Sequence, residues 1–157
     1  MSLQADIRGG DDFRVVEFSV QDSPLHLIVE ADDSDALARG IMKSLSVRAN
    51  RLFNAALGRG RGRVWGDRYH RRDLTSARQV RNALVYCLQN YKKHQRVKSG
   101  TRRIDPCSST RWFQGWNAIR QHDDGPRPTE KARTVLFRTA WQKHGSIDPG
   151  EATCTPN

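Results

Sequence analysis

The sequence predicts an α+β fold, and three observations support that prediction. Two short runs rich in β-branched and aromatic residues come first, and two longer segments with apolar residues at helical spacing follow. The chain has 157 residues, 36% of them hydrophobic, so it can bury the core of one ordinary domain but not of two large ones. No internal repeat is visible. Strands combined with two helices therefore favour a single α+β sandwich.

A β-hairpin is expected first. Residues 13–20 (FRVVEFSV) and 25–30 (LHLIVE) have the composition of strands, and the four residues between them (QDSP) suit a turn. Because successive side chains of a strand point to opposite faces, His26 should share a face with Ile28 and Glu30. A single histidine in a strand is either a hydrogen-bonded structural residue or a ligand, and its position leaves both interpretations open.

A long amphipathic helix is expected next. Asp33 or Ser34 can cap its start, and Gly58 should end it. Its apolar residues recur at helical spacing and should face the core. They are Leu37, Ile41, Leu45, Leu52 and Ala56. The outer face of this helix carries arginine.

A basic connection leads to a second helix. Residues 58–63 alternate glycine with arginine, which is typical of a mobile loop that grips phosphates, and short β-like stretches follow around 64–65 and 69–74. Thr75 should cap the second helix, which runs to about His94. Its buried side should hold Val80, Ala83, Leu84, Cys87, Leu88 and Tyr91.

The rest of the chain is expected to form a C-terminal tail, residues 105–157, after a main domain at residues 1–104. A basic linker at 95–111 precedes most of the tail, and a Pro-rich break at 125–130 leads to a short helix around 131–144. The tail is also rich in aromatic residues, which include Trp112, Phe113 and Trp116.

Charge is distributed unevenly along the chain. The net charge of +10 divides into −7 over residues 1–38, +16 over residues 39–103 and +1 over residues 104–157. A block at +16 favours a polyanionic partner. Nucleic acid fits better than an anionic membrane, because the block has no apolar face separate from the one its core needs.

Cellular location follows from what the sequence lacks. Its apolar runs are too short to span a bilayer, and residues 1–12 lack the pattern of a secretory signal. Cys87, Cys107 and Cys154 are odd in number and form no CxxC pair, so free thiols in a reducing compartment are the simplest interpretation. We expect a cytoplasmic protein with no membrane partner.

Tyr86 is the strongest candidate for chemistry. Helical geometry places it with Asn82, Asn90 and Lys93 on the face opposite the apolar stripe. A tyrosine there is either an amphipathic boundary residue or a nucleophile that attacks a metal-bound phosphate. Asn90, one turn later, is either simply solvated or offers its carboxamide oxygen to that metal.

Three segments combine into a family pattern. They are Pro24-Leu25-His26 at a strand, Trp65-Gly66-Asp67-Arg68-Tyr69-His70 in the basic connection, and Tyr86-Cys87-Leu88-Gln89-Asn90 on a helix. This combination resembles the REP-associated tyrosine transposases, a branch of the HUH single-strand transposases. The resemblance covers roughly residues 13–149 and is most specific over residues 64–94.

The resemblance implies a ferredoxin-like antiparallel sheet with two main helices packed on it. The chain departs from the family in two ways. Pro24 stands where the first metal histidine is expected, and an amide nitrogen cannot coordinate a metal. The twelve residues before Phe13 are too few for the first strand and helix of the family. We therefore expect an incomplete sheet whose open edge is covered or paired with another chain, in a monomer or a homodimer, and either a truncated reading frame or a remnant.

The resemblance also implies a reaction. Tyr86 would attack a phosphodiester of single-stranded DNA, form a 5′-phosphotyrosine and release a 3′-hydroxyl, with Mg²⁺ or Mn²⁺ held by His26 and Asn90. The loss of one ligand predicts a weakened metal site and weak or absent cleavage. Hairpin-forming repetitive palindromes would be the target.

DNA binding should survive these departures, because it depends on a local cluster of cations beside aromatic residues that can stack on bases. The candidate DNA-binding residues are Arg59, Arg61, Arg63, Trp65, Arg68, Tyr69, Arg71, Arg72 and Lys93. Trp65 and Tyr69 could equally belong to the core. The alternatives to an active transposase are a DNA-binding remnant without catalysis and a basic RNA-binding protein.

Overall fold

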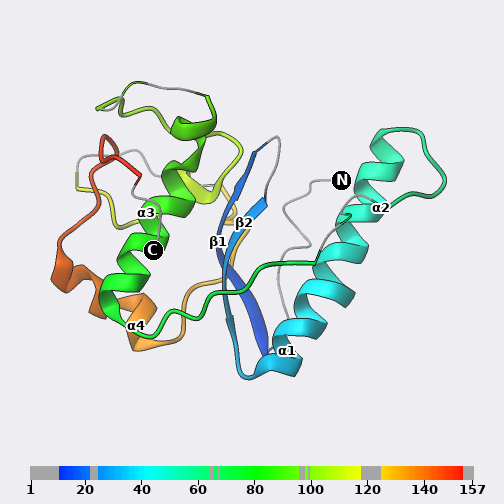
Figure 1. Ribbon diagram of the computed structural model, residues 1–157, viewed down its shortest axis with the longest axis horizontal. Coiled ribbons are helices and arrows are strands. Elements are labelled where there is room, and N and C mark those ends of the chain that lie inside the picture. The colour runs from blue at the N-terminus through cyan, green and yellow to red at the C-terminus, as the bar shows by residue number, and fades with distance from the viewer. Residues whose placement is uncertain are drawn as a thin grey trace.

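A two-stranded hairpin lies at the centre of the computed structural model, which describes residues 11–21, 25–63, 66, 68–95, 98, 100–117 and 125–153 (Figure 1). Strands β1 (Phe13–Val20) and β2 (Leu25–Ala31) pair antiparallel, with a register shift between Val15 and Glu17. The expected hairpin is confirmed.

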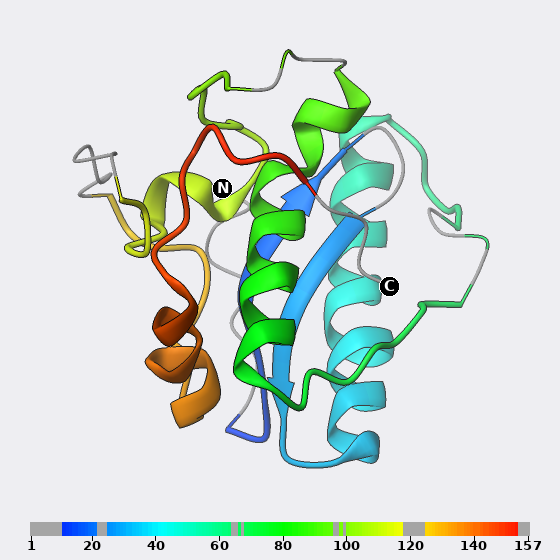
Figure 2. The ribbon, with the colours of Figure 1, turned by 60° about the vertical axis from the view of Figure 1, so that its left-hand side comes forward.

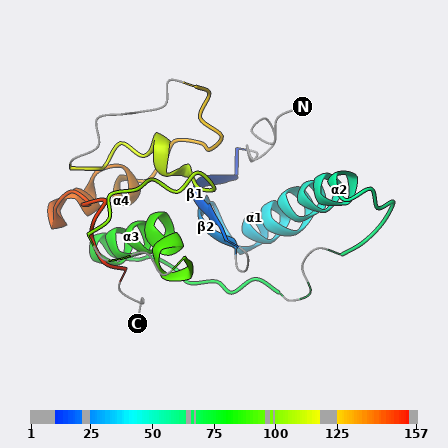
Figure 3. The ribbon, with the colours of Figure 1, turned by 90° about the horizontal axis from the view of Figure 1, so that it is seen from above.

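Both faces of the hairpin are apolar, and each packs against a helix. Val16 and Ile28 lie on one face, against α3 (Ala77–His94). Val15 and its neighbours on the other face pack against Leu37, near the start of the long helix. Figures 2 and 3 show the two helices on opposite sides of the hairpin. The described residues form no ferredoxin-like sheet, but the fold is α+β as expected.

The long helix has three consecutive parts and 23 residues in all. Helix α1 (Ser34–Ala38) continues through a π-helical stretch (Arg39–Leu45) into α2 (Ser46–Ala56). Asp33 is its N-cap and accepts a hydrogen bond from the Ala36 amide at 2.7 Å. A Cβ at Gly40 would lie 2.2 Å from the Phe13 ring, so this close approach to the hairpin requires glycine.

Only the first half of this helix packs on the hairpin. Leu37 is buried and Ile41 packs beside it, whereas Leu45, Leu52 and Ala56 are not buried. No residue of α2 is buried, and Figures 1 and 3 show α2 extending away from the hairpin. The expectation that these three residues face the core is wrong, because the two-stranded sheet does not reach them.

Helix α3 begins one residue later than expected. Ser76, not Thr75, is its N-cap, and the Gln79 side chain completes a capping box. Val80, Leu84, Cys87, Leu88 and Tyr91 are buried as expected, and Ala83 packs against the same core from a partly buried position. The stretch at 69–74 is not a strand; it runs as an irregular connection in front of the hairpin (Figure 1).

The C-terminal segment is packed against the main domain. Phe113, Trp141 and Ile147 belong to the same core cluster as Val80 and Leu84 of α3. The short helix expected around 131–144 consists of α4 (Val135–Arg138) and a 3₁₀ helix (Ala140–His144).

Polar contacts also fix this segment in place. The Arg81 guanidinium donates to both carboxylate oxygens of Glu151, at 2.8 and 2.9 Å. The outer edge of β1 is covered as well, because the Val20 amide donates to Cys107 O at 2.8 Å and the Glu130 amide to Val15 O at 2.9 Å.

No described helix combines the length and the apolar composition needed to cross a bilayer.

Candidate functional site

A wide cleft runs along β2, between the long helix and α3. It is lined by β2, by the inner side of α2, by the connection at residues 68–74 and by Gln79, Asn82 and Tyr86 of α3. Its volume is about 2170 Å³, whereas small-molecule sites occupy roughly 300 to 1,000 Å³. The cleft therefore suits a segment of a polymer better than a small molecule.

Tyr86 and His26 meet on the α3 side of this cleft. Their rings are in edge contact, with centroids 5.0 Å apart and planes at 83°. Tyr86 is half-buried on the flank of α3, because the neighbouring positions Val85 and Cys87 turn into the core. The fold thus brings together two candidate residues that are 60 positions apart in the sequence, and both line the cleft.

Cys87 lies next to this pair but is not a candidate nucleophile. Its thiol is buried 3.9 Å from the carbonyl oxygen of His26. Burial raises the pKa of the Cys87 thiol far above its ordinary value, and the charges of Glu17 and Asp105 raise it further. The thiol therefore stays protonated, which leaves the Tyr86 hydroxyl as the candidate nucleophile at this position.

Asn90 does not lie on an exposed face with Tyr86, contrary to expectation. It is 0% exposed, it does not line the cleft, and neither its carboxamide oxygen nor its nitrogen has a hydrogen-bond partner among the described residues. The chain after α3 folds back over this end of the helix: Tyr91 donates to Arg103 O, and Thr110 donates to Leu88 O at 3.2 Å. That covering buries four consecutive residues of α3, positions 89–92.

The described residues do not fit a divalent cation at this site. No three His, Cys, Asp or Glu side chains of the described chain are grouped so that they could hold a metal ion. His26 lines the cleft, but Asn90 is enclosed away from it, and Mg²⁺ requires oxygen ligands together with room for its own water molecules. Pro24 lies outside the described residues. The metal stays a prediction.

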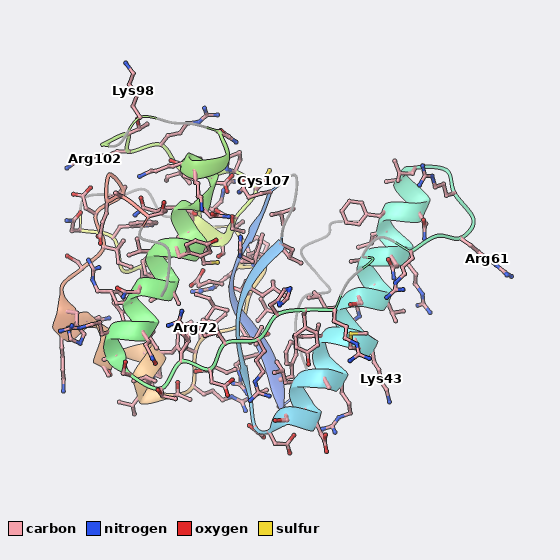
Figure 4. All side chains as sticks on the ribbon, viewed as in Figure 1. Lys43, Arg61, Arg72, Lys98, Arg102 and Cys107 are labelled. Carbon is pink, nitrogen blue, oxygen red and sulfur yellow. The ribbon has the colours of Figure 1, made fainter. Side chains whose placement is uncertain are left out.

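The connection at residues 68–74 supplies the cationic wall of the cleft. Arg71 anchors it: its guanidinium binds the Asp73 carboxylate at 2.6 and 3.0 Å and donates to Ser34 Oγ at 2.9 Å. Arg68 and Arg72 are exposed, line the cleft and form no ion pair with another described residue. Arg72 projects from the connection beside α3 (Figure 4). These two arginines, rather than Arg71, are therefore available to a ligand.

The Gly/Arg turn lies at the far end of α2 and is attached to it. Gly58, with φ of +64°, ends the helix in the left-handed region that favours glycine. The Asn54 side chain donates to Gly62 O at 2.9 Å, and the Arg59 amide donates to Asn54 O at 2.8 Å. These bonds attach the turn to the last residues of α2. Arg61 points outward at its tip (Figure 4).

The remaining candidates divide between the cleft and other surfaces. Arg63 and Tyr69 line the cleft, and Tyr69 is 40% exposed, so its ring is accessible rather than part of the core. Arg59 and Arg61 line a smaller hollow beside α2. Lys93 is exposed on α3 but does not line the cleft, and Trp65 lies outside the described residues.

The sequence did not indicate the apolar wall of the cleft. Leu45, Ala49 and Leu52 line it from the long helix, and helical spacing alone assigned this stripe to the core. One indication was available in the number of strands: the sequence predicts two, and two strands are too few to cover a helix of this length.

Comparison of the chain with protein-family models, with curated proteins and with solved structures gave no match.

Proposed function

We propose that this protein binds single-stranded or hairpin DNA along the cleft beside β2. The observation that carries the proposal is that exposed cations and accessible aromatic rings line one polymer-sized cleft: Arg68 and Arg72 with Tyr69 and Tyr86. Cations track a phosphate backbone, and aromatic rings stack on unpaired bases regardless of sequence. The +16 charge of residues 39–103, five of whose arginines line the cleft, favours the same class of partner; those arginines are Arg48, Arg63, Arg68, Arg71 and Arg72.

The proposal includes kinship with the REP-associated tyrosine transposases. In that interpretation the hairpin, the long helix and α3 are part of a ferredoxin-like domain. The contact between His26 and Tyr86 supports this kinship, because a metal ligand and a nucleophile acting on one phosphate have to lie close together. The target would be a repetitive palindrome that folds into a hairpin.

DNA binding without efficient cleavage is the better supported half of this function. Cleavage needs a metal site, and the second proposed ligand, Asn90, is enclosed within the fold. Binding needs only the surface charge and the rings that line the cleft. A DNA-binding remnant therefore agrees with the geometry better than an efficient nuclease does.

Binding can be tested by fluorescence anisotropy with a labelled hairpin oligonucleotide that carries a single-stranded flank. We expect affinity to fall steeply with salt, and the double variant Arg68→Ala/Arg72→Ala to bind about tenfold or more weakly at low salt. Arg138→Ala is the matched control, because Arg138 is exposed on α4 and does not line the cleft. Unchanged affinity of the double variant would refute the cleft as the binding site, and equal affinity for an unrelated RNA stem would favour an RNA-binding protein.

Strand cleavage is the second candidate function, favoured by the position of the Tyr86 hydroxyl in the same cleft. The tyrosine oxygen would form a bond to phosphorus while the bond from phosphorus to the 3′-oxygen breaks, which leaves a 5′-phosphotyrosine and a free 3′-hydroxyl. With Mn²⁺ we expect little or no covalent adduct on denaturing gels for the natural sequence, and more adduct for Pro24→His. An adduct that persists in Tyr86→Phe would remove Tyr86 as the nucleophile. No gain in Pro24→His would show that the proposed metal position is wrong.

A further inference from the structure

A second cationic surface lies beside α2, outside the cleft. It is a hollow of about 490 Å³ between α2 and the Gly/Arg turn. Arg51 of α2 lines it together with Arg59 and Arg61 of the turn; all three are exposed, and none of them forms an ion pair with another described residue. Residues 36–66 contain no acidic side chain that could compete for these charges from nearby in the sequence. The hollow is therefore accessible to a polyanion.

The turn that carries two of these arginines is attached to α2 at both of its ends. The Arg59 amide donates to Asn54 O at 2.8 Å, and the Asn54 side chain donates to Gly62 O at 2.9 Å. These bonds give the backbone at Arg59 and Arg61 a fixed position relative to α2. Cations that are placed in advance suit a ligand whose own charges stand at regular, fixed positions.

The hollow and the cleft offer different surfaces to a nucleic acid. None of the described residues that line the hollow is aromatic, whereas the Tyr69 and Tyr86 rings and the apolar side of the long helix line the cleft. Unpaired bases bind by stacking on such rings. Arginines without rings bind phosphates, which a duplex presents on its outside while its bases are paired within. The hollow therefore suits a duplex, and the cleft suits an unpaired strand.

The two surfaces meet at the end of the Gly/Arg turn. Gly62 lines the hollow, and the next residue, Arg63, lines the cleft. Figure 4 shows Arg61 and Arg72 well apart, one at the tip of the turn and the other beside α3. One DNA molecule can therefore contact both surfaces if its paired and unpaired parts join near Arg63.

We propose that the double-stranded stem of a DNA hairpin binds the hollow beside α2 through phosphate contacts to Arg51, Arg59 and Arg61, while the unpaired flank of the same DNA lies in the cleft. This assignment rests on the proposed function and adds a second site to it. Phosphate contacts carry no direct sequence information. The hollow thus positions the stem, and contacts with bases are left to the cleft.

Binding of the separate parts of the hairpin tests this assignment. Fluorescence anisotropy compares a blunt duplex of the stem sequence with the flank alone as a single strand. For Arg59→Ala/Arg61→Ala we expect the affinity for the duplex to fall about tenfold at low salt, and the affinity for the single strand to change less than about twofold. The plot of log Kd against log salt should also become less steep for the duplex, by about 2, because two phosphate contacts are lost.

Arg138→Ala/Lys143→Ala is the matched control. It removes the same charge from exposed positions that line neither the hollow nor the cleft, so it should bind both oligonucleotides as the natural protein does. An equal loss for duplex and single strand in Arg59→Ala/Arg61→Ala would indicate a general attraction between charges and would overturn the stem site. Unchanged affinity for the duplex would overturn it as well.

The stem site and the cleft can fail separately. If duplex binding depends on Arg59 and Arg61 while single-strand binding is unchanged in Arg68→Ala/Arg72→Ala, the cleft is refuted and the stem site stands. If single-strand binding depends on Arg68 and Arg72 while duplex binding does not change in Arg59→Ala/Arg61→Ala, the stem site is refuted and the proposed function stands.

Discussion

Glu17 is the most perturbed acidic residue among those whose surroundings the structure describes. It lies on β1, is 2% exposed, and its Oε1 accepts a hydrogen bond from Arg127 Nη2 at 2.7 Å. Burial raises the pKa of Glu17 to about 7, and the nearby positive charge of Arg127 only partly opposes that rise. The neutral form of Glu17 is therefore favoured in the folded protein over a pH range in which the unfolded chain is ionised.

This perturbation predicts that folding stability falls as pH rises. Below the unfolded pKa of 4.5 both states are protonated, and between 4.5 and about 7 only the folded state holds the proton, so stability decreases over that window. The pKa difference corresponds to about 3 kcal/mol. Glu17→Gln should remove this decrease, as seen by urea unfolding at pH 5 and pH 8.

Asp32→Asn, at an exposed position, should leave the pH profile of stability as it is. If Glu17→Gln lost stability relative to the natural sequence at pH 8 but not at pH 5, the ion pair with Arg127 would dominate over burial, and the predicted direction would be wrong.

At the same scale, Tyr86 and Asn90 show what helical spacing can and cannot predict. The spacing correctly separated Tyr86 from the apolar stripe, and Tyr86 lines the cleft. It failed for Asn90, one turn later, because a segment more than ten residues away covers that end of α3. The spacing of apolar residues predicts which face of a helix packs on one neighbouring surface. It does not predict that a distant segment will cover the other faces.

At the scale of elements, the strands and both helices were predictable because each has a local signal. The hairpin has β-branched residues on both sides of a turn, and α3 has a cap and a regular apolar stripe. The π-helical stretch at Arg39–Leu45 has no comparable signal. It lies where the helix passes from the hairpin to the cleft, and the close contact of Gly40 with Phe13 fixes the first half against the sheet.

The second half of the long helix shows a further limit of sequence patterns. An apolar stripe predicts that something covers it, but not which surface does so. Here Leu37 meets the hairpin, whereas Leu45 and Leu52 face a cleft. The difference arises from the number of strands, which the helical spacing of these residues does not predict.

For the whole molecule, the C-terminal segment and the main domain share one core. Phe113, Trp141 and Ile147 pack with Val80 and Leu84, and Arg81 is held by Glu151 and by Gly145 O at 3.1 Å. The sequence left open whether this segment packs, because its aromatic residues are spaced without a helical or strand period. Phe113, Trp141 and Ile147 pack on residues of α3 that are distant in sequence.

A chain that ends at residue 104 should therefore fail to fold cooperatively. It would expose the apolar face of α3 that Trp141 and Ile147 cover, and it would leave the outer edge of β1 without its partner at Cys107. Two strands and two helices without that cover bury too little apolar surface to offset the loss of chain entropy. Urea unfolding followed by circular dichroism should show a broad change without a sigmoidal transition.

A chain that ends at Ala152 keeps Glu151 bound to Arg81, and it should unfold in one sharp transition close to that of the full chain. Cooperative unfolding of residues 1–104 would show that the hairpin and its two helices are stable alone, and that the C-terminal segment only adds to a fold already complete.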